Sequence, residues 1–225
     1  MSAAQRPSAP SPGTRRYFTL LYTPQARREE LNTLLAVADE ISATPTVTAD
    51  HSVAHVRLEW WRQEAERFSR GEPQHPWLRA LLSEHPSTAS LDLLPLVEGA
   101  AVDLATHTLA SQDGHALRRA LFELAASALC TAPLPPEVRQ GVGELGAKLE
   151  RLESDPSDAQ ARSALQQQLQ QIGDAPQRAL TPLLVWLALA ARRSQPRTAV
   201  LESLTNNLIA WSAARRAARG RFRLQ

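Results

Sequence analysis

Two arginines and two tryptophans lie close together in residues 51–76, HSVAHVRLEWWRQEAERFSRGEPQHP. Arg57 precedes Trp61 by four residues, so on a helix the two side chains share one face, and Arg62 follows directly. An inward guanidinium can bind a phosphate through paired hydrogen bonds. It can equally form an ion pair with a carboxylate inside the bundle, because an unpaired buried charge is costly. Both interpretations stay open, and we favour the ion pair.

Acidic and aromatic side chains could complete such a site. Glu40 either pairs with an inward arginine or is the remnant of a metal site. Asp103 and His107 are four residues apart, so they could bind a metal ion together. No third ligand lies near them in the sequence, which favours a helix cap or a surface position. Trp60 and Trp61 could line a cavity for an apolar chain, but neighbours on a helix face different ways, so at least one should belong to the core or an interface.

Helices are the elements that must position these residues. In residues 51–76 the apolar side chains recur at helical intervals and predict one amphipathic helix that buries them, ended by Gly71. The members of this stripe are Val53, Val56, Leu58, Trp60, Trp61, Ala65 and Phe68. Further helices are predicted, with proline or glycine between them, at 15–22, 24–42, 75–82, 91–110, 115–130, 136–152, 157–172, 176–193 and 196–220. The pattern predicts a single-domain all-α bundle over residues 14–225, after a disordered tail at 1–13.

Composition narrows the possible functions. The chain has 225 residues and a formal net charge of +2, which argues against a nucleic-acid binder. Its single cysteine excludes an internal disulfide framework and suits a reducing compartment. The longest apolar run, residues 179–191, is shorter than the roughly 20 residues that span a bilayer. We therefore expect a cytoplasmic protein that can lie at the inner face of the membrane but does not cross it.

The order RLxWWRxE and then GxPxHP resembles the squalene/phytoene synthase family of all-helical prenyl synthases. The segment RRYFTLLYTPQARREELNTLLAVADEI resembles the first segment of that family, and VEGAAVDLATHTLAS resembles a later one, with Asp103 at the position of a family aspartate. The tail NNLIAWSAARRAARGRF is similar to the last helix of the branch that includes a mitochondrial complex I assembly factor, in which Glu40 matches a lone glutamate. The resemblance implies the isoprenoid synthase fold.

The resemblance also implies a chemistry. Active members join two prenyl diphosphates, and two DxxxD motifs on facing helices bind the Mg²⁺ ions that neutralise the departing pyrophosphate. In this chain Ser42 and Thr46 occupy the positions of the first aspartate pair. The region of the second motif has no DxxxD pattern, and its two aspartates, Asp155 and Asp158, are three residues apart around a proline. These departures predict no catalytic residue, no metal ligand and no cofactor.

Three hypotheses follow. The first is a divergent family member that has lost Mg²⁺-dependent prenyl transfer and serves as a binding or assembly scaffold for a lipid-like ligand or a membrane-associated partner. The alternative is an active head-to-head prenyl diphosphate transferase, with Mg²⁺ bound by an altered site built from Glu40, Asp103 and the inward arginines. A deep polar pocket with at least three converging carboxylates would favour that enzyme. The third is a protein whose cavity is filled by its own side chains and which acts only through its surface.

The end of the chain is basic and lacks acidic residues from Ser203 onward. Arginines near a helix C-terminus interact favourably with its dipole. The same charges could contact anionic lipid or an acidic partner, with apolar help from a neighbouring aromatic residue. Both interpretations stay open for the residues concerned, which are Arg215, Arg216, Arg219, Arg221, Phe222 and Arg223.

Overall fold

The computed structural model of the chain describes residues 6–44, 51–108, 115–155, 158–191 and 199–223, and within them all side chains except those at 51, 106–108, 174–175 and 199–204. Every regular element in these ranges is a helix, as predicted. In chain order the elements are α1 (Arg15–Leu21), α2 (Gln25–Ser42), α3 (His51–Ser69), α4 (Pro76–Glu84), the short 3₁₀ helix η2 (Pro86–Ser90), α5 (Leu94–Thr108), α6 (Ala116–Leu129), α7 (Pro136–Ser154), α8 (Ala159–Ile172), α9 (Asp174–Ala179), α10 (Thr181–Ala190) and α11 (Ala199–Ala217).

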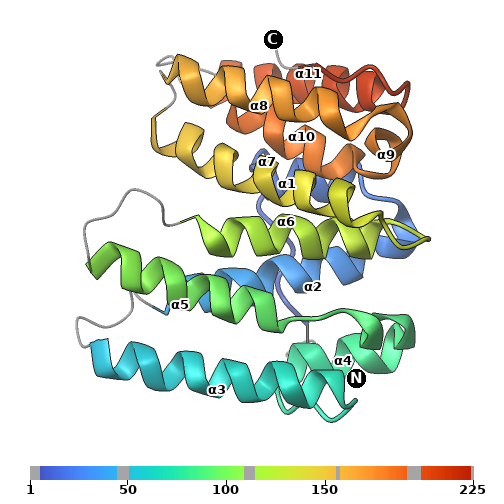
Figure 1. Cartoon of the computed structure of the whole chain (residues 1–225). Helices are drawn as coiled ribbons and strands as arrows, with labels where there is room; N and C mark the ends of the chain where they lie inside the picture. The colour runs from blue at the N-terminus through green and yellow to red at the C-terminus, as the bar shows by residue number, and fades with distance from the viewer. Residues whose placement is uncertain (1–5, 45–50, 109–114, 156–157, 192–198, 224–225) are drawn as a thin grey trace.

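The helices stack in two layers (Figure 1). In one layer α3, α5, α6, α7 and α8 follow one another as packed neighbours. Behind it lies α2, which contacts α5 and α6. The remaining helices of this layer follow in the order α1, α10 and α11: α1 packs on α2 and α10, and α10 packs on α11. The Trp-rich helix α3 and the C-terminal helix α11 therefore lie at opposite ends of the molecule (Figure 1).

The centre of the core is formed by α6 and α10. Eight of the fourteen residues of α6 are buried, among them Phe122, and seven of the ten residues of α10 are buried. The apolar run 179–191 is thus explained by burial within the protein. Among the described residues, no helix combines the length and apolar character needed to cross a membrane.

Glycine ends α3 at the predicted position. Gly71 has φ of +81°, a conformation that favours glycine. The N–H of Gly71 donates to the carbonyl oxygen of Phe68, and the N–H of Glu72 donates to that of Arg67. This pair of bonds is a Schellman motif, and it turns the chain out of α3 toward α4.

The structure corrects two predictions about the helices. The single helix expected at 176–193 is divided at Leu180 into α9 and α10, because Pro182 in the first turn of α10 supplies no N–H to continue the hydrogen bonds of α9. The buried stripe predicted on α3 is narrower than expected. Val53, Val56 and Trp60 lie on its outer side, with 43%, 70% and 40% of their surface exposed.

Candidate functional site

The Trp-rich motif of α3 fastens a loop. Glu64 is completely buried, and its Oε1 accepts hydrogen bonds from the backbone N–H groups of Gln74 and His75, both at 2.7 Å. Its Oε2 accepts from Nε of Arg67 at 2.8 Å. The N–H groups of Gln74 and His75 lie beyond the last bonds of α3, so this carboxylate supplies the acceptor for two donors of the loop 71–75. The spacing of RLxWWRxE and GxPxHP therefore has a structural cause.

An aromatic group follows at the end of that loop. The His75 ring lies between Trp61, at a centroid distance of 5.2 Å, and Trp77, at 5.1 Å. Trp60 packs edge-on against Trp61, at 5.0 Å between centroids. His75 Nε2 lies 3.3 Å from Oε2 of Glu40 on α2. The structure thus brings the predicted cavity residues Trp60, Trp61 and Glu40 together, around a histidine that was not predicted as a site residue.

The two candidate site arginines of α3, Arg57 and Arg62, are not placed alike. Arg62 is exposed, and its Nε lies 3.6 Å from Oε2 of Glu59 on the same helix. The favoured ion pair is thus present, but it faces solvent, so the prediction of an inward charge is wrong for Arg62. Arg57 is half-buried.

A second polar group gathers where α1, α6, α7 and α10 meet, and we call it the Arg118 cluster. It consists of Arg15, His115, Arg118, Glu150 and Glu153. Arg118 Nη2 lies 3.4 Å from Glu153 Oε2, and its Nε lies 3.7 Å from Glu150 Oε2. Arg15 pairs with Glu153 from α1, and His115 Nδ1 lies 3.7 Å from Glu150 Oε2. The Arg118 guanidinium also lies over the Trp186 ring, 5.3 Å from its centroid. Two carboxylates of α7 are thus occupied by cations.

Asp39, near the end of α2, is also paired with an arginine. Its Oδ2 accepts from Nη1 of Arg16 at 2.6 Å, and Nη2 of Arg16 donates to the backbone and side-chain oxygens of Asn32 at 2.8 and 2.9 Å. Burial lowers the pKa of the Arg16 guanidinium, and the Asp39 charge opposes that effect. This arginine fastens α1 to α2.

Asp103 caps the next helix. Its Oδ1 accepts from the backbone N–H of Ala116 at 2.8 Å, and its Oδ2 accepts from that of Leu117 at 3.1 Å. These are the first two residues of α6, whose N–H groups have no partner within the helix. The cap was the favoured sequence interpretation. The side chain of His107 lies outside the described residues.

Sequence reasoning missed Arg118, Glu150 and Glu153 as a group. Burial is the first cause of a raised pKa at Glu150; Arg118 and His115 lower that pKa, and Asp103 and Glu153 raise it. A partial signal was present, because Glu150 and Glu153 are three residues apart and share a helix face. Their cation lies on another helix, 35 residues before Glu153, and no local pattern predicts that contact.

A raised pKa at Glu150 has a testable consequence. The folded state holds this proton more tightly than the unfolded chain, so the stability contributed by Glu150 falls as pH rises above its ordinary pKa of 4.5. We expect Glu150→Gln to be at least as stable as the wild type at pH 7, with the difference vanishing toward pH 4. Urea unfolding across this range measures it. Glu137→Gln, at an exposed position of the same helix, is the control and should show no such trend. A variant that is less stable at pH 7 would mean that the pairs with Arg118 and His115 dominate.

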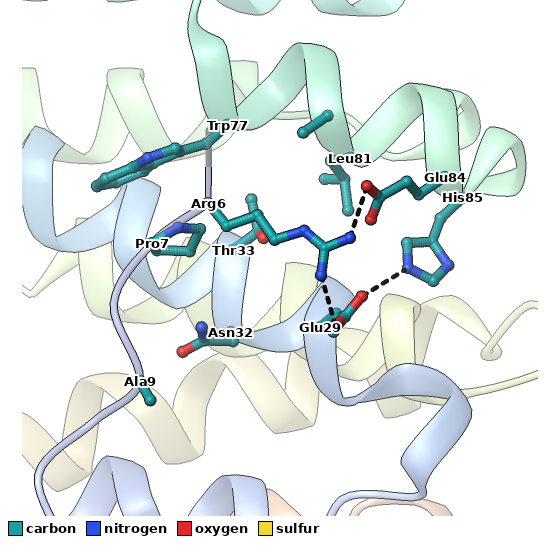
Figure 2. A pocket seen from close by; sticks show the side chains of 11 residues that line it. Arg6, Pro7, Ala9, Glu29, Asn32, Thr33, Trp77, Leu81, Glu84 and His85 are labelled. Carbon is teal, nitrogen blue, oxygen red and sulfur yellow. Dashed lines mark hydrogen bonds and ion pairs between the residues drawn. The ribbon is translucent and has the colours of Figure 1, made fainter. Parts of the chain in front are cut away.

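A pocket of about 130 Å³ lies at the start of α2, beside the end of α4 (Figure 2). Arg6 enters it from the N-terminal segment, with Nη1 3.0 Å from Glu29 Oε1 and Nη2 2.7 Å from Glu84 Oε1. His85 Nε2 lies 3.9 Å from Glu29 Oε2. Residues 1–5 of the predicted tail lie outside the described residues. An adjoining apolar groove of about 290 Å³ is lined by Ala9, Pro10, Tyr17, Leu20, Leu21, Arg28, Glu29 and Asn32.

The basic C-terminal residues are placed differently from the aromatic residue among them. Arg215, Arg219, Arg221 and Arg223 are exposed, and Arg216 is half-buried. Phe222 is only 3% exposed, and its backbone N–H donates to Oε1 of Gln177 at 3.0 Å. Phe222 therefore belongs to the core and cannot contribute to a contact with lipid or a partner.

Comparison with known proteins places these features in a family. A sequence model described as squalene/phytoene synthase matches residues 10–120. The chain belongs to the squalene/phytoene synthase family. Members have an all-α isoprenoid synthase fold, in agreement with the helices described above. No curated protein and no solved structure matches the chain. The matched residues include Glu64, Glu40 and Asp103. The hydrogen bonds from Glu64 to the loop 71–75, the aromatic group around His75 and the cap on α6 therefore all lie within the matched segment.

The residues at and beside the family's motif positions do not fit a magnesium cluster, because Ser42 stands at one of those positions and the nearest acids are Asp39 and Glu40. Mg²⁺ requires several oxygen ligands in near-octahedral geometry. Asp39 and Glu40 are adjacent and bind different partners, Arg16 and His75. In the part of the chain that the structure describes, three acidic or histidine groups come within 4.8 Å of one another only at Glu29, Glu84 and His85. That group lies about 15 Å along α2 from Asp39, at 1.5 Å per residue.

Proposed function

We propose that this squalene/phytoene synthase-like protein lacks Mg²⁺-dependent prenyl transfer and acts as a binding or assembly scaffold, cytoplasmic and able to associate with a membrane. The observation that supports it best is that the carboxylates near the two motif segments are held by basic side chains, while Ser42 stands where the family has an aspartate. Asp39 is paired with Arg16, Glu40 with His75, and Glu150 and Glu153 with Arg118. A guanidinium beside a carboxylate competes with a divalent ion for the same oxygens and repels its charge.

The scaffold function also needs a place for a lipid-like ligand. The groove beside α1 is a suitable candidate, since Tyr17, Leu20 and Leu21 give it apolar walls and Arg28 lies at its edge. Its volume of about 290 Å³ is at the lower end of the range for small-molecule sites. An apolar chain with an anionic or polar head would match this lining.

The direct test is incubation of the pure protein with farnesyl or geranylgeranyl diphosphate and Mg²⁺, with pyrophosphate release as the readout. We expect no release above a protein-free control. Turnover that requires Mg²⁺ would overturn the proposal and would favour the alternative, a head-to-head prenyl diphosphate transferase with an altered site. In that case Glu40→Gln and Asp103→Asn should abolish turnover, whereas Glu66→Gln, at an exposed position, should not.

A binding measurement tests the scaffold itself. Titration of the protein with farnesol or a farnesyl phosphate analogue, followed by equilibrium dialysis, should show saturable binding. Leu21→Asn should weaken it by roughly tenfold, because this side chain is 45% exposed and forms a wall of the groove. Val102→Asn, a comparably exposed apolar position on α5, should leave it unchanged. Equal weakening by both variants, or no saturable binding, would contradict this site.

A further inference from the structure

The C-terminal helix α11 carries its apolar side chains in an unusual arrangement. The face packed on α10 is made of four buried alanines, Ala210, Ala213, Ala214 and Ala217. The opposite side presents Leu208 and Trp211, with 67% and 53% of their surface exposed. A helix that only completes a core normally turns its large apolar residues inward. Among the described side chains of α11, small residues allow close packing and Ile209 is partly buried against the core, but Leu208 and Trp211 face solvent.

The exposed face also carries positive charge. Leu208, Trp211 and Arg215 are spaced by three and four residues and so lie along one side of the helix. The Arg215 guanidinium lies 5.2 Å from the centroid of the Trp211 ring. Arg219 and Arg221 follow in exposed positions, and the sequence from Ser203 to the end contains no acidic residue. We call the surface formed by Leu208, Trp211, Arg215, Arg219 and Arg221 the α11 face.

We propose that the α11 face binds the surface of an anionic lipid bilayer. An indole ring is amphipathic and is favoured at the level of lipid head groups, and arginine can keep its charge among phosphates while its stem follows the apolar boundary. Each arginine near an anionic membrane contributes about fivefold to binding. The absence of acids removes the repulsion that an anionic surface would otherwise meet. The proposal deepens the proposed scaffold function, because it names a lipid bilayer as the partner. Binding of the α11 face to a bilayer does not depend on whether the protein catalyses prenyl transfer.

The turn that ends α11 explains the position of Phe222. Gly220 has φ of +67°, and its N–H and that of Arg221 bond to the carbonyl oxygens of Ala217 and Arg216, which ends α11 in a Schellman motif. The turn sends Phe222 into the core and leaves Arg221 exposed. The buried Phe222 side chain therefore holds the basic end of the chain beside α11. The apolar contact with lipid is made by Leu208 and Trp211.

Vesicle flotation with the full chain tests the proposal. The protein should float with vesicles of phosphatidylcholine containing phosphatidylglycerol and not with phosphatidylcholine alone, and high salt should weaken binding. Trp211→Ser should lower the partition coefficient by roughly tenfold. The double variant Arg215→Gln/Arg219→Gln should lower it by about 30-fold. The matched control is Trp60→Ser, which removes an exposed tryptophan at the opposite end of the molecule, next to the exposed Glu59, and should bind like the wild type.

Several results would overturn the proposal: no flotation with anionic vesicles, equal binding to neutral vesicles, or equal weakening by Trp60→Ser and Trp211→Ser. Analytical ultracentrifugation tests the alternative that the α11 face binds a second copy of the chain. A dimer that Trp211→Ser dissociates, without flotation, would assign the α11 face to a second copy of the chain. Pyrophosphate release in the prenyl transfer assay would contradict the scaffold function and leave the flotation result standing, so the two failures can be told apart.

Discussion

Replacing Glu64 with alanine is expected to lower the free energy of unfolding by about 3–5 kcal/mol. The carboxylate is fully buried and holds two backbone N–H groups of the loop and the side chain of Arg67. Its removal leaves the donors of Gln74 and His75 without their acceptor and Arg67, whose side chain is 19% exposed, without its counter-charge. Each buried donor without a partner costs about 1–3 kcal/mol. The loss should exceed that from any exposed ion pair of the molecule.

Urea unfolding followed by circular dichroism measures this difference. Glu66→Ala, two residues along the same helix and exposed, is the matched control and should change stability by less than about 0.5 kcal/mol. Glu64→Gln should fall between the two, because an amide oxygen can still accept from the loop while its NH₂ group faces Arg67. The loop also places His75 beside Glu40 and the tryptophans, so the alanine variant should alter tryptophan fluorescence in the native state. A loss below about 1 kcal/mol would show that other contacts hold the loop.

The helices of this fold could be predicted because their causes are local. Apolar spacing predicted α3, and Gly71 ended it through backbone bonds that involve only neighbouring residues. The face that a helix buries was harder to predict. Trp60 and Trp61 are the same residue type and adjacent, yet Trp60 is exposed and Trp61 is in the core, because α5 packs against one side of α3 only.

The candidate site depends on contacts between distant segments. Arg118 reaches Glu153 across 35 residues, and Arg16 reaches Asp39 across 23. Such pairs follow from which helices become neighbours, and the sequence pattern of one helix does not contain that information. For Asp103 a cap was one of two favoured interpretations, but its N–H donors lie 13 and 14 residues later, so the sequence did not show which helix it caps. For the α11 face, the sequence indicated the arginines but not the apolar side chains beside them. Its apolar part was assigned to Phe222, whereas the turn at Gly220 buries that ring and leaves Trp211 outside.

The close approach of α5 to α6 supports the second large effect. A Cβ atom added at Gly99 would lie 2.6 Å from the backbone nitrogen of Leu117 and 2.7 Å from the carbonyl carbon of Ala116. Backbone atoms cannot rotate away as a side chain can, so the two helices would have to separate. We expect Gly99→Ala to lower the free energy of unfolding by about 3 kcal/mol, even though alanine favours a helix by about 1 kcal/mol over glycine.

A matched control exists on α7. A Cβ atom at Gly141 would lie 3.2 Å from Nε2 of Gln168, the far end of a flexible side chain that can move. Gly141→Ala should therefore leave stability unchanged or raise it by up to about 1 kcal/mol. Both variants exchange the same residue types inside a helix, so the difference between them isolates the helix–helix contact. Equal tolerance of the two would show that α5 and α6 can separate at little cost.

A double-mutant cycle then links Gly99 to Asp103. The cap on Ala116 and Leu117 requires α5 to lie against the start of α6, and the missing side chain at Gly99 is what permits that approach. Asp103→Ala alone should cost about 1 kcal/mol through the lost cap. In the Gly99→Ala background the same substitution should cost much less, because separation of the helices has already removed the bonds. Additive losses would mean that the cap survives the separation and that Gly99 and Asp103 act independently.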